Sequence, residues 1–188
     1  MRAGAQDGTI SDATLIARVL VDEDQHAFAA LVRRNQSAVR AALRKLTRGN
    51  AELADDLAQE TFLLAYRNLR NFRGDAKFGT WLYRIAYNAF ISGTRRRREE
   101  QLDADAEVEG QAPAEPARHD LRMDLERAMR RLSEAEHAAI VQCYFNDLSH
   151  EEAAYVLGWP LGTVKTHILK AKQKLKDAMA GWETGENA

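Results

Sequence analysis

The sequence predicts an all-α protein of two small helical lobes joined by a flexible acidic linker. Apolar residues recur at helical spacing along most of the 188-residue chain, and no stretch alternates apolar and polar side chains as a half-buried strand does. Residues 99–118 are rich in acids, contain two of the three prolines and have almost no large apolar side chain. Such a segment buries too little surface to fold. We therefore expect a first lobe at residues 1–98 and a second at residues 119–180.

Three amphipathic helices are expected at the start of the first lobe. The first covers residues 11–21, and the second runs from near Asp24 to Gly49, a residue type that often ends a helix. Asn50 is placed to cap the third helix. Its apolar positions include Leu53, Leu57, Leu64, Tyr66 and Leu69. Asp55, Asp56, Gln59 and Glu60 are not apolar, so this helix buries one face and leaves another polar.

A segment that combines aromatic rings with cations follows the third helix. After a loop around residues 72–79, Thr80 is expected to cap a fourth helix that ends near Gly93. The rings and cations are Phe72, Phe78, Trp81, Tyr83 and Tyr87 with Arg73, Lys77 and Arg84. Rings that stack on unpaired bases, beside cations that hold the backbone, are the two ingredients of single-strand binding. The alternative is that Trp81 and its neighbours belong to the core, but rings near the rim of a loop favour nucleic-acid contact.

The second lobe is expected to open with supporting helices. Helices resume near His119, and an apolar stripe follows at Leu121, Leu125, Met129 and Leu132. Ser133 and Glu136 form a capping box, in which each side chain bonds the other residue's backbone N–H. We expect the helix that starts there to pack under the last two helices of the chain.

Those last two helices, within residues 148–176, have the pattern of a helix-turn-helix. Ser149 and Glu152 form a second capping box, Gly158 suits a left-handed C-terminal cap, and a proline follows two residues later. Thr163 is expected to cap the second helix. Its inward stripe is Val164, Ile168, Ala171 and Leu175, and its outer face carries Lys165, Thr166, His167, Lys170, Gln173 and Lys174. A basic face of this kind neutralises phosphates and reaches base edges in the major groove.

The composition limits the classes of protein to which this chain can belong. The formal net charge is −1, yet this sum hides a basic run at residues 95–98 beside the acidic linker. Cys143 is the only cysteine, which excludes an internal disulfide and a cysteine-built zinc site. No signal peptide and no run of about 18 apolar residues is visible, so we expect a cytoplasmic protein without a membrane span.

No catalytic constellation is complete, and no cofactor or metal is expected. Glu134 and His137 have a di-iron spacing but lack the further ligands, so they are interpreted as a first-turn acid and an exposed histidine. His150 would begin a zinc-protease motif, but Ala154 stands where the second histidine is required. Cys143 has no arranged base and is interpreted as a buried structural thiol. We expect no enzymatic activity.

The order of these motifs resembles a known family. The chain reads first DDLAQETFLLAYRNLRNFRG, then FGTWLYRIAYN, then the acidic linker, and finally LSHEEAAYVLGWPLGTVKTHILKAK. This order resembles the extracytoplasmic-function (ECF, group IV) sigma factors of bacterial RNA polymerase, and the likeness covers about residues 12–177. It implies a subunit that directs core polymerase to specific promoters, recognises the minus-35 element and melts the minus-10 element.

The resemblance also implies which residues carry each contact. Contact with the polymerase core is implied for Asp55, Asp56, Gln59, Glu60 and Phe62. Contact with the minus-10 element is implied for Phe72, Arg73, Lys77, Trp81, Tyr83, Arg84, Tyr87 and Asn88, the last in the base pocket. Contact with the minus-35 duplex is implied for Thr163, Lys165, Thr166, His167, Lys170 and Lys174.

The implied partners are core polymerase, through its beta-prime clamp helices and beta flap, promoter DNA, and an anti-sigma factor. The linker would thread toward the RNA exit path. The chain departs from the family's frequent Ser-Arg at Thr166 and His167, and from arginine at Lys170 and Lys172. Lysine lacks the bidentate fork that arginine offers guanine, so these residues do not predict the preferred promoter bases. The alternative function is a stand-alone helix-turn-helix regulator that binds duplex operators.

Overall fold

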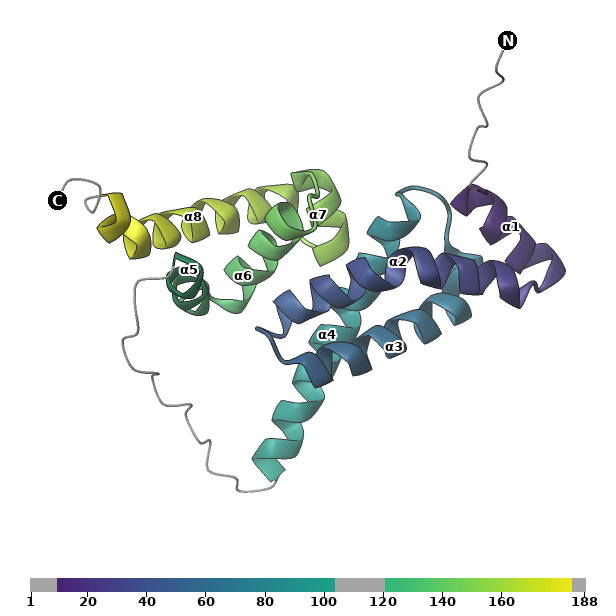
Figure 1. Ribbon diagram of the computed structural model, residues 1–188, viewed down its shortest axis with the longest axis horizontal. Coiled ribbons are helices and arrows are strands. Elements are labelled where there is room, and N and C mark those ends of the chain that lie inside the picture. Colours follow the sequence, from purple (N-terminus) through teal and green to yellow (C-terminus); the bar gives the residue numbers. More distant parts are fainter. Residues whose placement is uncertain (1–9, 104–120, 184–188) are drawn as a thin grey trace, which may run out of the picture.

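A computed structural model describes residues 10–103 and 121–183. The described residues form helices and connecting turns without a strand, which confirms the all-α prediction. Figure 1 shows a first lobe, at the right and below, that contains the first four helices, and a second lobe at the upper left that ends in the long α8. The acidic residues 104–118 of the expected linker, and His119, lie outside the described residues.

The first lobe is a helical bundle whose helices begin where their caps predict. Its elements are α1 (Asp12–Asp22), α2 (Gln25–Leu46), α3 (Ala51–Asn68), the 3-10 turn η1 (Leu69–Asn71) and α4 (Phe78–Asp103). Ser11, Asp24 and Asn50 each accept a hydrogen bond from a backbone N–H of the first turn. Leu31, Leu43 and other large apolar side chains are fully buried between the helices. These caps and the apolar stripes together fix α1, α2 and α3.

The fourth helix differs from its predicted bounds at both ends. It begins at Phe78, and Thr80 lies inside its first turn with a buried side chain rather than capping it. It also continues through Gly93 to Asp103, so residues 99–103, at the start of the expected linker, are helical. In Figure 1 the C-terminal part of α4 projects beyond the bundle. The basic run at residues 95–98 therefore lies on this projecting part.

The second lobe consists of four α-helices and one π-helical turn. They are α5 (Leu121–Arg130), α6 (Glu134–Ile140), η2 (Val141–Phe145), α7 (His150–Leu157) and α8 (Leu161–Glu183). Both predicted capping boxes are confirmed, at the starts of α6 and α7. The π-helical turn was not predicted, and it leaves Tyr144 and Phe145 exposed.

Two sequence predictions for this lobe are wrong. α8 begins at Leu161, so Thr163 is not its cap; instead the Thr163 N–H donates to the carbonyl of Pro160 over 2.9 Å. His137 is buried, with 6% of its surface exposed, rather than exposed on the helix surface. The charges of Arg48 and Lys45, from the first lobe, act on this buried ring, and no local pattern reveals that proximity.

The two lobes pack directly on each other. One apolar cluster contains residues of both, among them Leu82 of α4, Val141 of η2 and Val156 of α7. α4 lies against α7, and α2 lies against η2.

Candidate nucleic-acid interface

The helix-turn-helix has the geometry that its sequence predicts. Gly158 adopts φ 69° and ends α7 in the left-handed conformation, where a side chain would be strained. The Trp159 N–H then donates to the Ala154 carbonyl over 3.1 Å. Val164, Ile168 and Ala171 of α8 are buried, which confirms the inward stripe. This packing sets the orientation of the opposite, basic face.

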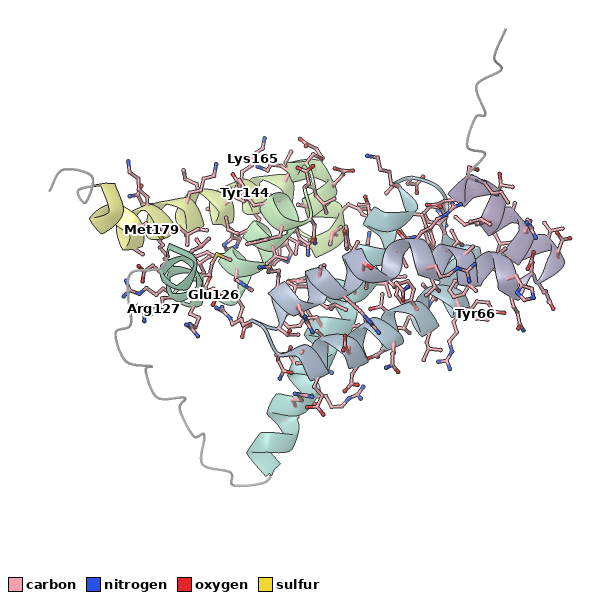
Figure 2. All side chains as sticks on the ribbon, viewed as in Figure 1. Tyr66, Glu126, Arg127, Tyr144, Lys165 and Met179 are labelled. Carbon is pink, nitrogen blue, oxygen red and sulfur yellow. The ribbon has the colours of Figure 1, made fainter. Side chains whose placement is uncertain are left out.

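Some of the predicted duplex-binding side chains are exposed, and others contact neighbouring residues of the protein. Lys165, Thr166 and Lys170 are exposed, and Figure 2 shows Lys165 at the upper edge of α8, away from the first lobe. The Thr166 hydroxyl donates to the Gly162 carbonyl over 2.9 Å. Thr163 is half-buried. The exposed members share the first half of α8, so they form one polar surface.

Lys174 makes an ion pair inside the lobe. Its ammonium lies 2.7 Å from the carboxylate of Glu136, which also accepts the Ser133 N–H at the start of α6. The hydrogen bond from Lys174, opposed by burial and helped by the Ser133 backbone, holds the Glu136 pKa below its usual value. This pair ties α6 to α8, and 48% of the Lys174 side chain remains exposed.

His167 has a different environment from the exposed lysines. Its ring lies 5.3 Å from the ring of Trp159, and its Nδ1 is buried without a hydrogen-bond partner. The ring is half-buried, so only part of it faces solvent. His167 thus connects the basic face of α8 to the turn before it.

The rings at the start of α4 form a cluster rather than an open platform. The ring centroids of Phe72, Phe78 and Trp81 lie 5.2 to 5.6 Å apart, with Phe72 and Phe78 edge to face. Trp81 is 9% exposed and Phe78 is buried. The core interpretation therefore holds for these two rings, whereas Arg73 and Lys77 on the same loop are exposed.

The next turns of α4 carry the other predicted single-strand contacts. Arg84 and Asn88 are exposed and lie one turn apart on the same side of the helix. Tyr83 is half-buried, and burial raises its pKa. Tyr87 is 6% exposed; burial, together with the charge of Glu134, raises its pKa to about 12. Asn88 is thus open while Tyr87 is covered.

The second lobe covers this part of α4. The Arg84 guanidinium lies 4.6 Å from the ring centroid of Tyr155, a cation–π contact. The Tyr87 ring meets the ring of Trp159 edge to face at 6.3 Å. The predicted single-strand surface and the turn of the helix-turn-helix are therefore in contact.

The predicted polymerase-binding residues lie along α3 beside an open groove. Asp56, Gln59 and Glu60 are exposed, and Asp55 pairs with Arg40 at 3.5 Å. The groove has a volume of about 580 Å³ and runs between α2 and α3. It is lined by Gln25, Phe28, Val32, Gln36, Arg40, Ala58, Gln59, Phe62, Leu63 and Tyr66. Gln59 and Phe62 are thus the two predicted residues that reach it.

Sequence reasoning missed two exposed apolar residues on this groove. Leu63 is 60% exposed and Tyr66, seen on α3 in Figure 2, packs its ring edge to face on Phe28. The available signal was the run FLLAY, which holds more apolar residues than one buried stripe of a helix needs. Such residues on a groove are suited to contact another protein.

The described residues also bear on metal binding and on membrane insertion. They contain no group of three or more His, Cys, Asp or Glu side chains arranged to hold a metal ion. None of the described helices is both long and apolar enough to cross a lipid bilayer.

Burial raises the pKa of the Cys143 thiol, which is half-buried.

Comparison with known proteins identifies the family. Residues 31–100 match the family model for sigma-70 region 2, and residues 122–175 match that for sigma-70 region 4. The ECF RNA polymerase sigma-E factor of Haemophilus influenzae is 32% identical over 182 residues, which span 89% of this chain and 95% of the relative. The chain belongs to the ECF family of RNA polymerase sigma factors.

Other relatives agree with this assignment. The RNA polymerase sigma-H factor of Pseudomonas aeruginosa is 35% identical over 83% of this sigma factor and 88% of its own length. ECF sigma factor SigE of Mycolicibacterium smegmatis is 37% identical over 74% of this chain, but the match spans only 58% of that relative. The predicted family is confirmed, which favours a sigma factor over a stand-alone operator-binding regulator.

Solved structures share the fold. The sigma factor RpoE of Bartonella quintana, in complex with the anti-sigma factor NepR, matches with a TM-score of 0.69 and 28% identity, over 81% of this chain and 96% of that one. CnrH, in complex with the cytosolic domain of CnrY, matches with a TM-score of 0.66 and 28% identity, over 90% and 97% of the two chains.

Proposed function

We propose that this sigma factor brings core RNA polymerase to promoters by reading the minus-35 duplex with α7 and α8 and melting the minus-10 element with α4. The observation that carries the proposal is the α7–α8 helix-turn-helix, whose second helix presents Lys165 and Thr166 to solvent in its first turns. The N-terminal turns of a recognition helix are the part that reaches base edges. Lys170, one turn further on, is placed for the phosphate backbone.

The first lobe supplies the minus-10 contacts in this proposal. Asn88 receives an unpaired base, and Arg73 and Lys77 hold the strand from the loop before α4. Trp81 and Phe78 act by fixing that loop, because their rings are packed on each other. Lys174 positions α8 through Glu136 rather than binding DNA itself.

Core polymerase binds along α3 and the groove beside it. The carboxylates and amide of Asp56, Gln59 and Glu60 suit a basic partner surface such as the beta-prime clamp helices, and the apolar groove receives its side chains. The second lobe contacts the beta flap. The residues of the acidic linker follow the RNA exit path.

The test of duplex reading compares two lysines of α8. Lys165→Ala should weaken binding of the holoenzyme to its promoter about tenfold and reduce its discrimination against substituted minus-35 bases. Lys176→Ala removes the same charge from an exposed position outside the predicted set and is the control. The promoter is obtained by mapping transcript starts after overproduction. Equal binding by both variants would contradict the assignment.

The test of melting uses Asn88. Asn88→Ala should leave duplex binding intact but abolish promoter opening, measured by permanganate reactivity of the minus-10 thymines and by run-off transcription with core polymerase. Ser92→Ala, at an exposed position one turn later, is the control. If the Asn88 variant opens promoters normally, the pocket assignment is wrong; if the wild-type chain binds no polymerase at all, the whole proposal fails.

Polymerase binding can be tested with a substitution that leaves the buried apolar core of the protein intact. Leu63 is 60% exposed, so Leu63→Asp removes an apolar groove contact at little cost to folding. It should weaken binding to core polymerase about tenfold, as expected for a central apolar contact. Val21→Asp is the matched control, because Val21 is 79% exposed at the end of α1, away from the groove. Similar affinities of the two variants would refute the groove as the polymerase site.

An anti-sigma factor regulates this chain in the proposal. The Bartonella relative was solved with its anti-sigma factor, and the groove between α2 and α3 offers an apolar site for a partner. Pull-down from the native host under non-inducing conditions should recover a second protein besides the polymerase subunits. Recovery of polymerase alone would remove this part of the proposal.

A further inference from the structure

The basic run at residues 95–98 lies outside the packed core of the first lobe. It belongs to the part of α4 that projects beyond the helical bundle (Figure 1). Arg95, Arg96 and Arg97 are exposed, and residues 94–101 include no apolar side chain. This segment therefore adds nothing to the apolar core, and its charges face a partner or solvent.

One side of α4 continues from the predicted base pocket to this basic run. Residues three and four positions apart share a side of a helix, so Asn88, Ile91, Ser92 and Arg95 follow one another along α4. All four side chains are exposed, Ile91 by 44%. Arg97 follows Asn88 by about two and a half helical turns and therefore lies on the opposite side of α4. The run thus has one arginine in line with the pocket and one facing away from it.

A shallow hollow marks the side that carries Asn88. It has a volume of about 250 Å³ and is lined by Ile91, Ser92, Arg95, Arg96 and Glu99. The Arg95 Nε lies 3.3 Å from a carboxylate oxygen of Glu99, and the two side chains are 81% and 63% exposed. An ion pair this exposed is weak, so a stronger anion displaces the carboxylate at little cost. Guanidinium groups bind phosphate through paired hydrogen bonds, which makes phosphate the matching anion.

The position of the hollow relative to Asn88 indicates which phosphates it reaches. Arg95 lies about 10 Å beyond Asn88 along the helix axis, and successive base pairs of duplex DNA are about 3.4 Å apart. In the proposed function the loop before α4 holds the opened strand. The C-terminal part of α4 leads away from that loop, and the promoter stays double-stranded between the minus-10 and minus-35 elements. The hollow therefore faces duplex DNA about three base pairs from the end of the opened segment.

We propose that Arg95 and Arg96 bind backbone phosphates of the duplex just upstream of the minus-10 element. The inference rests on the minus-10 role of α4 in the proposed function and adds a contact outside both promoter elements. Phosphate contacts fix the register of a protein on DNA without reading its sequence. The two arginines thus set the point at which the duplex ends and the strand held by Asn88 begins.

The first test compares two arginines on opposite sides of α4. Arg95→Gln should weaken binding of the holoenzyme to its mapped promoter about fivefold and lower the slope of log affinity against log salt by about one. Both effects should be the same for promoters that differ in spacer sequence. Arg97→Gln makes the same change on the far side of the helix and should alter neither quantity. Equal effects of the two substitutions would overturn the inference.

The carboxylate beside Arg95 provides a test of opposite sign. Glu99→Gln removes a negative charge from the hollow, so it should strengthen promoter binding about twofold. Weaker binding by this variant would contradict a phosphate in the hollow. All three positions are exposed and glutamine is a good helix former, so the variants should fold, as circular dichroism verifies.

The second test locates the phosphates. Neutral methylphosphonates are placed one at a time along the spacer of the promoter. Those about three base pairs upstream of the opened segment should weaken binding of the wild-type holoenzyme about fivefold and have no further effect on Arg95→Gln, because the contact is already lost. Methylphosphonates in the middle of the spacer should affect both proteins equally. If every position affects the two proteins equally, Arg95 does not touch the spacer and the inference is wrong.

Failure of this inference can be told apart from failure of the proposed function. Arg95→Gln should bind core polymerase as tightly as the wild type does; weaker binding would mean that the hollow receives a protein, and would refute the contact with DNA. If the wild-type holoenzyme opens the promoter while Arg95→Gln and Arg97→Gln behave alike, only the inference falls. If the wild-type chain never opens the promoter, the proposed function fails and the inference fails with it.

Discussion

At the scale of single residues, neighbours from distant parts of the chain decide the chemistry. His137 lies on the first turns of α6, next to the capping box that starts this helix, and local sequence predicts it to be exposed. Burial, with the charges of Arg48 and Lys45 at the end of α2, lowers its pKa to about 4. The neutral imidazole is therefore part of the folded state, and its protonation opposes folding.

The pH dependence of stability should show this effect. The unfolded chain takes up the His137 proton near the ordinary pKa of about 6.5, and the folded chain only near 4, so the free energy of unfolding falls as pH decreases through that window. Between pH 7 and pH 5 the free energy of unfolding of the wild type should fall by about 1 kcal/mol more than that of His137→Gln. This value is smaller than the full pKa shift would give, because solvent screens the exposed cations. Urea unfolding at both pH values measures the difference. Identical pH dependence in the two proteins would contradict a buried neutral His137.

At the scale of elements, cap residues define most helix starts, and tertiary packing accounts for the exceptions. Gly93 was predicted to end α4, yet the helix passes through it, and a Cβ built at this glycine would lie 3.3 Å from a methyl group of Leu57. The glycine allows α4 to approach α3 closely. A small residue required for close packing and a glycine that stops a helix look the same in sequence.

The capping box of α7 provides a test at this scale. The Ser149 hydroxyl accepts the Glu152 N–H over 3.1 Å, and the Glu152 carboxylate accepts the Ser149 N–H over 3.0 Å. Ser149→Ala should lower the free energy of unfolding by about 1 kcal/mol, as loss of a cap typically does. Ser37→Ala, at an exposed position inside α2, should change it by less than about 0.5 kcal/mol. Thermal unfolding of both variants tests this, and an equal effect would mean that the cap does not stabilise the lobe.

At the scale of the whole molecule, the two lobes share buried surface. Residues of α2, α4, η2 and α7 belong to one apolar cluster, and the buried Tyr87 ring meets Trp159 of the second lobe edge to face. Two domains that meet through an apolar contact as well as polar ones are expected to influence each other's stability.

Hydrogen exchange should reveal this coupling. Val156 is 1% exposed in α7, and Val156→Ala removes buried methyl groups from the second lobe, which typically costs about 1 to 3 kcal/mol. Amides of α3 and α4 in the first lobe should then exchange faster in the free chain, together with those of α7. Unchanged exchange in α3 of the free variant would mean that the lobes unfold independently.

The sequence by itself determined the helices, both capping boxes, the helix-turn-helix with its inward stripe, and the family, because these depend on neighbours within a few positions or on the order of motifs. It also placed Lys165 on the outer face of the last helix. Only the tertiary structure decided that Trp81 packs inside an aromatic cluster, that Lys174 is engaged by Glu136, and that the second lobe covers Tyr87. The physical reason is that each of these depends on one helix face meeting another, and local periodicity does not specify which faces meet. In the last case the whole acidic segment separates the two faces in the sequence.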